Sequence, residues 1–479
     1  MSRLTRGLIL LVALAALVLP ASASAFTPND PLASRQWYLA ADRAFDFWPD
    51  LPVLTPVKVA VVDSGIDLGH PEFEGKIDAA RSFVGGDVND HDGHGTFVAG
   101  VIAAALDNGV GIAGIAFPAH LVVAKVVGRD GTISPDAEAH AIRWAADEGA
   151  RVINLSLGGV RDPRDLSRDT FSPAEEAAVE YAYGKGAVVV AAVGNGDQAP
   201  STPWRYASYP AALPHVIGVG ALAQDGTVPP YSNRDARFVD LAAPGDDILS
   251  TLPRSLTARV APTCLDQGYS DCGPFDFRNA QGTSFAAPQV AAAAALLLSV
   301  EPALRPEQVG FLLEHSAGDV APAGRDAFSG WGRLDVAAAL EALAAGDLPG
   351  LDALEPNDDA GDRAPEVFGR RRAITATADY WDDPVDVYRV KLAAGQTIST
   401  SVDGPAGVRT RLALWRPGTL HVIEPVSRPS LDRLKESRGA GPAEHILYRA
   451  RATGWYYLEV TLASPGYGPY TLQIAKSRL

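Results

Sequence analysis

A serine stands between a glycine-bearing turn and a long apolar segment at residues 281–298. The apolar residues from position 285 onward predict a helix that begins near Ser284. The first N–H groups of a helix have no partner within it and lie at the positive end of its dipole, so they can hold a developing oxyanion. Ser284 is therefore a candidate nucleophile. The alternative is that it only caps the helix, as serines before apolar helices commonly do.

Two other residues can activate such a serine. A hydroxyl is a weak nucleophile until a base takes its proton and a third group orients that base. His94 follows an acidic loop and is the candidate base, while Asp63 ends a β-branched run and is the candidate orienting group. Asn195 ends another apolar run in a Gly-Asn-Gly turn, where its amide can donate to the oxyanion beside the Ser284 N–H. These four residues predict nucleophilic catalysis.

The elements that must position these residues alternate between strands and helices. Apolar runs typical of buried parallel strands are separated by helical patterns, which predicts an α/β fold with helices on both faces of a parallel sheet. The carboxyl ends of parallel strands meet at one edge, so we expect Asp63 and Asn195 to converge there. This domain is expected at residues 26–346. Its strands are expected near residues 57–62, 121–127, 152–157, 187–193, 216–219 and 238–241.

The composition changes after residue 346. Gly, Pro and Asp are frequent at residues 347–365, which predicts a linker. Residues 366–479 carry short alternating or β-branched runs separated by Gly and Pro, the pattern of a smaller all-β sandwich. Because this unit has its own pattern, we expect a module that the first domain does not need for folding.

The charge balance excludes some classes of partner. The 479 residues include 57 acidic and 41 basic side chains, for a formal net charge of -16. Such a surface has no electrostatic reason to bind nucleic acid or anionic lipid. A hydrophobic content of 47% with 20% charged residues is typical of a folded, soluble protein.

Both the N-terminus and the cysteines indicate export. Residues 1–25 predict a signal peptide, because basic residues precede an apolar run of about a dozen residues, short for a membrane span of about 20. Cleavage is expected after Ala25 or Ala23; an uncleaved anchor is the alternative. No other stretch is expected to span a membrane, so the mature chain should be secreted. The two cysteines, Cys264 and Cys272, predict a disulfide.

The three candidate triad residues lie in the segments Val61-Val62-Asp63-Ser64-Gly65-Ile66, His94-Gly95-Thr96-Phe97-Val98-Ala99-Gly100 and Gly282-Thr283-Ser284-Phe285-Ala286-Ala287-Pro288. Together these segments resemble the subtilisin-like serine proteases, and the resemblance runs from about residue 28 to residue 345. The order Asp, His, Ser is also that of subtilisin. Three motifs of this length in this order are very specific.

This resemblance implies a serine endopeptidase that cleaves proteins or peptides through an acyl-enzyme, as a monomer and without a cofactor for its chemistry. It implies that Asp63, His94 and Ser284 form the triad and that Asn195 completes the oxyanion hole. Secreted members usually carry a folding pro-domain for which there is no room here, so the activation route is in doubt. The segment expected to pair with the substrate backbone comprises Ser156, Leu157, Gly158 and Gly159.

The resemblance also suggests a specificity pocket. If Tyr209-Pro210 aligns with the Tyr-Pro of subtilisins, Ser208 lies at the pocket floor. A small floor residue leaves depth for Phe, Tyr or Leu, each buried CH₂ contributing about 0.8 kcal/mol. Asp197 places a carboxylate near the rim, where a solvated charge contributes at most about 1 kcal/mol. We therefore expect a preference for large apolar residues before the cut, with Lys and Arg tolerated.

The C-terminal unit resembles the bacterial pre-peptidase C-terminal domain. The similarity is carried by Glu355-Pro356-Asn357-Asp358, Asp386-Val387-Tyr388 and Gly468-Pro469-Tyr470-Thr471-Leu472. These motifs are short. A rival interpretation of the whole chain is an inactive subtilisin fold that serves as a binding module, but the presence of all three triad residues argues against it.

Metal binding is a further alternative. His91, Asp92 and His94 could form a metal cluster, although this would leave Ser284 and Asn195 unexplained. A structural calcium ion is the other candidate, because loop oxygen ligands suit that ion. The residues that fall where subtilisins gather calcium are Gln36, Glu72 and Asn108, with Glu in place of the usual Asp. Solvated loop side chains explain the same residues equally well.

Overall fold

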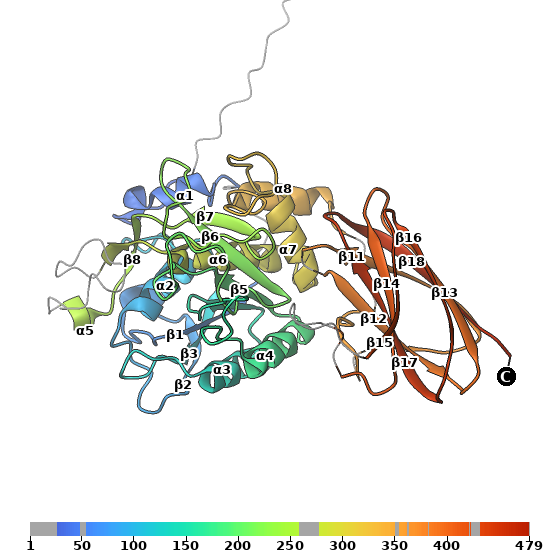
Figure 1. The fold of residues 1–479 in the computed structure, drawn as a ribbon. Helices are drawn as coiled ribbons and strands as arrows, with labels where there is room; N and C mark the ends of the chain where they lie inside the picture. Colours follow the sequence, from blue (N-terminus) through green and yellow to red (C-terminus); the bar gives the residue numbers. More distant parts are fainter. Residues whose placement is uncertain are drawn as a thin grey trace, which may run out of the picture.

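The computed structural model of the chain describes residues 26–47, 54–257, 277–349, 354–361, 364–381, 383–420, 422 and 432–478. It consists of an α/β unit followed by an all-β unit, as the sequence predicts (Figure 1). The expected signal peptide and both Cys264 and Cys272 lie outside the described residues, so the disulfide stays a prediction.

The first unit is built on a seven-stranded sheet in the order β2-β3-β1-β4-β5-β6-β7, with every neighbouring pair parallel. Strand β1 has β3 on one side and β4 on the other, and the crevice at such a switch point is the usual position of a site in open α/β sheets. The strands are β1 Lys58–Asp63, β2 Ile77–Ser82, β3 His120–Lys125, β4 Val152–Leu155, β5 Val188–Ala192, β6 Val216–Leu222 and β7 Leu241–Pro244.

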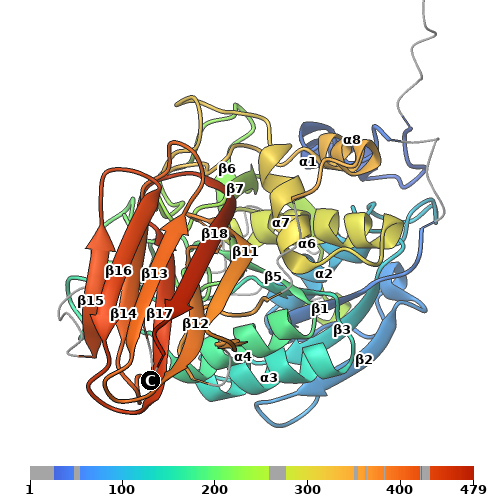
Figure 2. The same ribbon diagram turned by 90° about the vertical axis from the view of Figure 1, so that its right-hand side faces the viewer.

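Helices cover both faces of this sheet. Successive strand residues point to opposite faces, so Val59 and Val61 of β1 join one core cluster and Ala60 and Val62 join another. The first cluster includes residues of α2 His94–Ala103, α6 Thr283–Val300, α7 Pro306–His315 and α8 Val336–Ala345. The second includes residues of α3 Pro135–Asp147 and α4 Pro173–Gly184, which lie together beneath the sheet in Figure 2.

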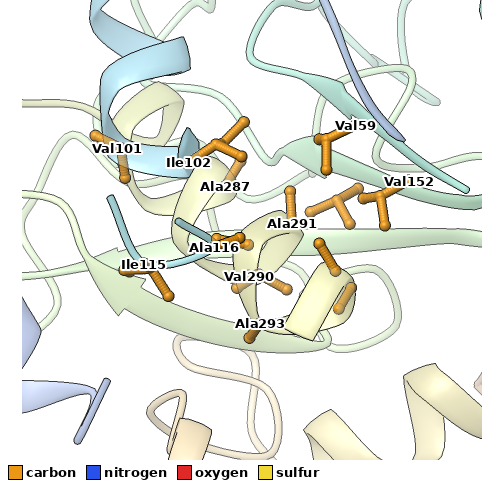
Figure 3. Packing of buried hydrophobic residues seen from close by; sticks show 14 of the residues in the cluster. Val59, Val101, Ile102, Ile115, Ala116, Val152, Ala287, Val290, Ala291 and Ala293 are labelled. Atoms are coloured by element: carbon orange, nitrogen blue, oxygen red, sulfur yellow. The ribbon is translucent and has the colours of Figure 1, made fainter. Parts of the chain in front are cut away.

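The buried helix α6 is the centre of the first cluster. Its small residues belong to this cluster, with Ala291 beside the strand residues Val59 and Val152 and Ala287 beside Ile102 of α2 (Figure 3). By length and composition α6 could cross a membrane, contrary to our expectation that no stretch beyond the signal peptide would. However, 89% of it is buried inside the fold, so its apolar character is that of a core helix.

Short elements complete the first unit. The strands β8 and β9 pair antiparallel, and β9 leads directly into the turn before α6. The short elements are η1 Ala33–Arg35, α1 Trp37–Ala41, η2 Pro71–Phe73, β8 Ile248–Thr251, α5 Arg254–Thr257 and β9 Phe277–Ala280.

The second unit is a sandwich of two sheets around its own apolar core. Gly346 ends α8 in the left-handed conformation with φ 73°, and the first strand begins at Glu366, close to the expected boundaries. The five-stranded sheet contains β10 Glu366–Val367, β12 Val385–Leu392, β17 Gly454–Leu462, β14 Thr410–Trp415 and β15 Arg433–Arg438. The four-stranded sheet contains β11 Arg371–Asp379, β18 Tyr467–Lys476, β13 Thr397–Asp403 and β16 Ala443–Arg449.

The two units are in direct contact, in part through residues of the predicted linker. Asp358, within the linker, is buried and accepts a hydrogen bond from His215 Nε2 of the first unit at 3.0 Å. Aromatic rings also meet across the junction, with Trp331 and Trp381 5.1 Å apart between centroids. The guanidinium of Arg325 lies 4.7 Å from the Trp381 ring. The two units therefore share a packed junction.

Candidate active site

Asp63 and His94 form a close pair at the carboxyl edge of the sheet. His94 Nδ1 lies 2.9 Å from Asp63 Oδ1 and 3.0 Å from Oδ2, with the Asp63 side chain only 2% exposed. Asp63 Oδ1 also accepts a hydrogen bond from the Ser64 N–H at 2.7 Å. The carboxylate therefore holds the imidazole at Nδ1 and leaves Nε2, on the other edge of the ring, available for proton transfer.

The glycine after His94 allows this approach. A Cβ at Gly95 would lie 2.3 Å from the carbonyl oxygen of Gly65 and 3.2 Å from Asp63 Cβ. Only glycine lets the first turn of α2 contact the backbone that follows β1. Since His94 is the first residue of that helix, the same contact sets the position of its ring.

The electrostatics of the pair favour a basic imidazole. Burial alone would lower the pKa of His94, but the Asp63 carboxylate outweighs this effect. The result is a pKa above the ordinary value, to which the carboxylates of Asp92 and Asp90 also contribute. His94 thus has the character of a general base that works best in alkaline solution.

Ser284 is the second residue of α6, after the N-cap Gly282 and Thr283. It is partly exposed, and it is not the N-cap, so the alternative of a simple capping serine is wrong. The ring of Phe285, the next residue, lies 5.3 Å from that of His94. This contact brings the start of α6 beside the imidazole.

Ser156 contacts the backbone of Ser284. Its hydroxyl donates to the backbone carbonyl of Ser284 at 2.7 Å and accepts from Asn154 Nδ2 at 2.9 Å. This hydrogen bond gives Ser156 a role in holding the helix start, whereas its sequence position suggested only a contact with substrate.

The amide of Asn195 has a defined orientation. Its Oδ1 accepts hydrogen bonds from both the N–H and the hydroxyl of Thr283, each at 2.9 Å. An amide whose oxygen is engaged in this way presents its NH₂ group to the other side. Asn195 and Ser284 line the same cavity, so this donor and the start of α6 face the same space. No sequence signal identifies Thr283 as a functional residue, although it directly precedes Ser284 in the motif.

A cavity of about 110 Å³ lies beside Ser284 and Asn195. Of the predicted substrate-binding residues it is lined by Leu157, Gly158, Gly159 and Ser208, but not by Ser156. It is also lined by Val160, Ala199 and Trp204, which no sequence signal identified.

Two details differ from the expected pocket. Gly159 exchanges both backbone hydrogen bonds with Tyr209, at 2.9 and 3.0 Å, so its N–H and C=O are already paired. Asp197 lines the cavity and is exposed as a whole residue, but partial burial of its carboxyl raises its pKa. A hydrogen bond from Asn195 counteracts this rise.

The expected calcium ligands are engaged in hydrogen bonds. Glu72 accepts from the Ile112 N–H and from Asn108 Nδ2, both at 3.0 Å, and burial raises its pKa to about 7. Gln36 Oε1 accepts from the Ala113 N–H at 2.8 Å. N–H donors thus contact oxygens that a calcium ion would need, and a calcium site at these residues stays a prediction.

The alternative metal cluster near His94 is not supported either. His94 Nδ1 contacts Asp63, whereas the exposed His91 lies 3.5 Å from Asp87. Within the described ranges, one group of acidic side chains has ligand atoms all within 4.8 Å of one another. It comprises Glu355, Asp358 and Asp383, at the junction of the two units.

Comparisons with known proteins agree with this geometry. The profile of the subtilase family matches residues 55–332, more than half of the chain. Thermitase of Thermoactinomyces vulgaris is 37% identical over 278 residues, which cover 57% of this chain and 86% of thermitase. Subtilisin E of Bacillus subtilis (strain 168) is 36% identical over 288 residues, 60% of this chain and 66% of that protein. The crystal structure of a lanthipeptide protease superimposes with a TM-score of 0.56 at 25% identity, covering 67% of this chain and 99% of that one. The protein therefore belongs to the subtilase family of serine endopeptidases.

Proposed function

We propose that this protein is an exported endopeptidase that cleaves peptide bonds through an acyl-enzyme on Ser284. The observation that carries the proposal is the bond of 2.9 Å between His94 and the buried Asp63, beside the start of α6. In this arrangement the roles of nucleophile, base and orienting acid each fall to one residue.

The first step transfers one proton and forms one bond. Ser284 Oγ attacks the carbonyl carbon of the scissile bond while its proton passes to His94 Nε2. Asp63 accepts the hydrogen bond from Nδ1–H and stabilises the imidazolium. The same proton then passes to the leaving amine as the C–N bond breaks. Water repeats the sequence on the acyl-enzyme and restores the Ser284 hydroxyl.

The oxyanion of the tetrahedral intermediate needs donors that are already oriented. Asn195 Nδ2 supplies one, because Thr283 holds the amide oxygen on the far side. The backbone N–H of Ser284 in the first turn of α6 supplies the second. Hydroxyl, imidazole, carboxylate and amide complete this chemistry, so we propose that it uses no cofactor.

The specificity we propose is broad, with large apolar side chains favoured before the cut. The cavity of about 110 Å³ beside Ser284 supports it, since Ser208 is among the residues that line it. Its backbone walls come from the segment of Leu157 and Gly158 and from the turn after β5. Lys and Arg before the cut are tolerated but not preferred, because the charge of the exposed Asp197 is screened by solvent and attracts them only weakly.

Export, the disulfide between Cys264 and Cys272 and the domain limits 26–346 and 366–479 belong to the same proposal. Residues 1–25 have the pattern of a signal peptide, and an oxidising compartment suits the disulfide. We assign the sandwich to the pre-peptidase C-terminal type on its three short motifs. The calcium site at Glu72 is not part of the proposal, because its oxygens serve N–H donors.

The test is labelling of the mature protein with a fluorophosphonate, followed by hydrolysis of a peptide library. Wild-type protein should form one adduct on Ser284 and lose activity in proportion. Ser284→Ala should neither label nor cleave, and His94→Ala should lose a similar share of turnover because the triad acts as a unit. Labelling of Ser284→Ala, or undiminished turnover in either variant, would show that the mechanism is wrong.

A further inference from the structure

We propose that Asp90 is a positioning residue of this peptidase, a buried carboxylate that ties the strand end carrying Asp63 to the helix start carrying His94. The inference rests on the triad proposed above and adds a residue that the triad motifs do not single out. Asp90 does not contact the reacting atoms, so its effect must act through the imidazole.

Asp90 is only 1% exposed and accepts five hydrogen bonds. Oδ1 accepts from the Ser64 hydroxyl at 2.8 Å and from the N–H groups of Asp92 and Gly93 at 3.0 and 2.7 Å. Oδ2 accepts from the N–H and the hydroxyl of Thr96 at 2.8 and 2.7 Å. All five donors are neutral N–H or hydroxyl groups.

These hydrogen bonds hold the chain on both sides of His94. Gly93 and Thr96 flank the first turn of α2, whose N-cap Gly93 has no side chain to satisfy the unpaired N–H groups. Asp90 takes over that capping role from outside the helix. The residue after His94 is held in the same network, because the Gly95 N–H donates to the Ser64 hydroxyl at 2.8 Å.

Ser64 closes the connection to Asp63. Its backbone N–H donates to Asp63 Oδ1 at 2.7 Å and its hydroxyl donates to Asp90 at 2.8 Å. A continuous chain of hydrogen bonds therefore joins both partners of the 2.9 Å contact between Asp63 and His94. A shift of either end by a fraction of an ångström would misalign Nε2 with the Ser284 hydroxyl.

Asp90→Asn is the first test variant. An amide has one accepting oxygen, so its NH₂ group must face N–H donors on one side, and the start of α2 must move. We expect kcat to fall between about 10- and 100-fold while KM changes less than about twofold, the pattern of a misplaced catalytic group. Asp225→Asn is the matched control, because Asp225 also accepts from a threonine N–H and hydroxyl, at 3.0 and 2.6 Å, on an exposed turn. It should match wild type.

The pH profile separates positioning from loss of folded protein. The charged groups that act on His94 are Asp63, Asp92 and Asp90, and all three raise its pKa. Removing the Asp90 charge should move the acid limb of kcat/KM to lower pH. A merely structural role would lower the fraction of enzyme that a fluorophosphonate titrates and leave kcat per titrated site and the acid limb unchanged.

Ser64→Ala is the second variant, for the case that Asp90→Asn does not fold. It keeps the Asp90 carboxylate and the backbone bond from Ser64 to Asp63, and removes only the hydroxyl that bonds Asp90 and Gly95. We therefore expect a smaller fall in kcat at unchanged KM. Wild-type kcat per titrated site in both variants, or in Ser64→Ala when it alone folds, would overturn the inference and leave the proposed triad intact. Failure of wild-type protein to label would instead refute the proposed function.

Discussion

The cavity beside Ser284 allows the specificity to be predicted in magnitude. Its volume is about 110 Å³, whereas an apolar cavity of about 150 Å³ holds benzene. The exposed residues Asp197 and Gln198 are among its lining, so the cavity opens to solvent. A Leu side chain fits inside, and a Phe ring fits with its far edge at the opening. Relative to Ala, Leu buries three more carbons, worth about 2.4 kcal/mol or about 60-fold in kcat/KM.

The assay is hydrolysis of a peptide series that differs only in the residue before the cut. We expect Leu, Phe and Tyr to exceed Ala by one to two orders of magnitude. Ser208→Leu should reduce that ratio, because it places an isobutyl group where Ser208 now lines the cavity. Turnover of the Ala peptide serves as the internal control, since its side chain does not reach the floor.

Cleavage mainly after Lys or Arg would refute this reasoning. It would mean that the Asp197 carboxylate contributes more than the roughly 1 kcal/mol of a screened charge. Asp197→Asn identifies the cause: if it abolishes cleavage after Lys, Asp197 forms an ion pair with the substrate. If cleavage after Lys persists, another acid is responsible.

Three other predictions concern the chemistry and the domains. Asn195→Leu should lower kcat with little change in KM, because it removes about 3 kcal/mol of transition-state stabilisation, which is the loss known for subtilisin itself. A rise in KM alone would make Asn195 a substrate contact. The acid limb of kcat/KM should have its midpoint above 6.5, because Asp63 raises the pKa of His94, and in Asp63→Asn the residual activity should have its midpoint at lower pH; an unmoved limb would assign the titration to another group. A chain that ends at Gly346 should unfold at lower temperature than the full chain, because it exposes the Trp331 ring that now contacts the sandwich. Equal melting temperatures, measured by circular dichroism, would instead support the expectation that the sandwich is an independent module.

Much of the site could be predicted from sequence because its signals are local. Asp63 follows a β-branched run, and His94 and Ser284 each lie in the first turn of a helix that follows glycine. The end of a strand and the start of a helix can each be predicted from a few adjacent residues. Such positions can therefore be assigned before any long-range contact is known.

The contacts that orient the site are not local, and these the sequence did not reveal. Thr283 and Asn195 are 88 residues apart, and nothing in either segment predicts that a threonine fixes the direction of the amide. The same holds for His215 and Asp358, which are 143 residues apart. Composition made residues 347–365 a linker, because Gly, Pro and Asp are typical of exposed chain. Asp358 is buried against His215 of the first unit, whereas Ala360 and Ala364 pack in an apolar cluster of the sandwich, and local composition encodes neither contact.

The calcium interpretation shows a different limit, that of transferring a role by position. Glu72 stands where an aspartate is usual, and its side chain is longer by one CH₂. That length lets Oε1 reach the backbone N–H of Ile112 and Oε2 the amide of Asn108, each at 3.0 Å. Burial raises the pKa of this carboxyl to about 7, and the two donors counteract the rise. In the described structure the Glu72 carboxyl therefore serves as a hydrogen-bond acceptor, a role that its alignment with a calcium ligand does not predict.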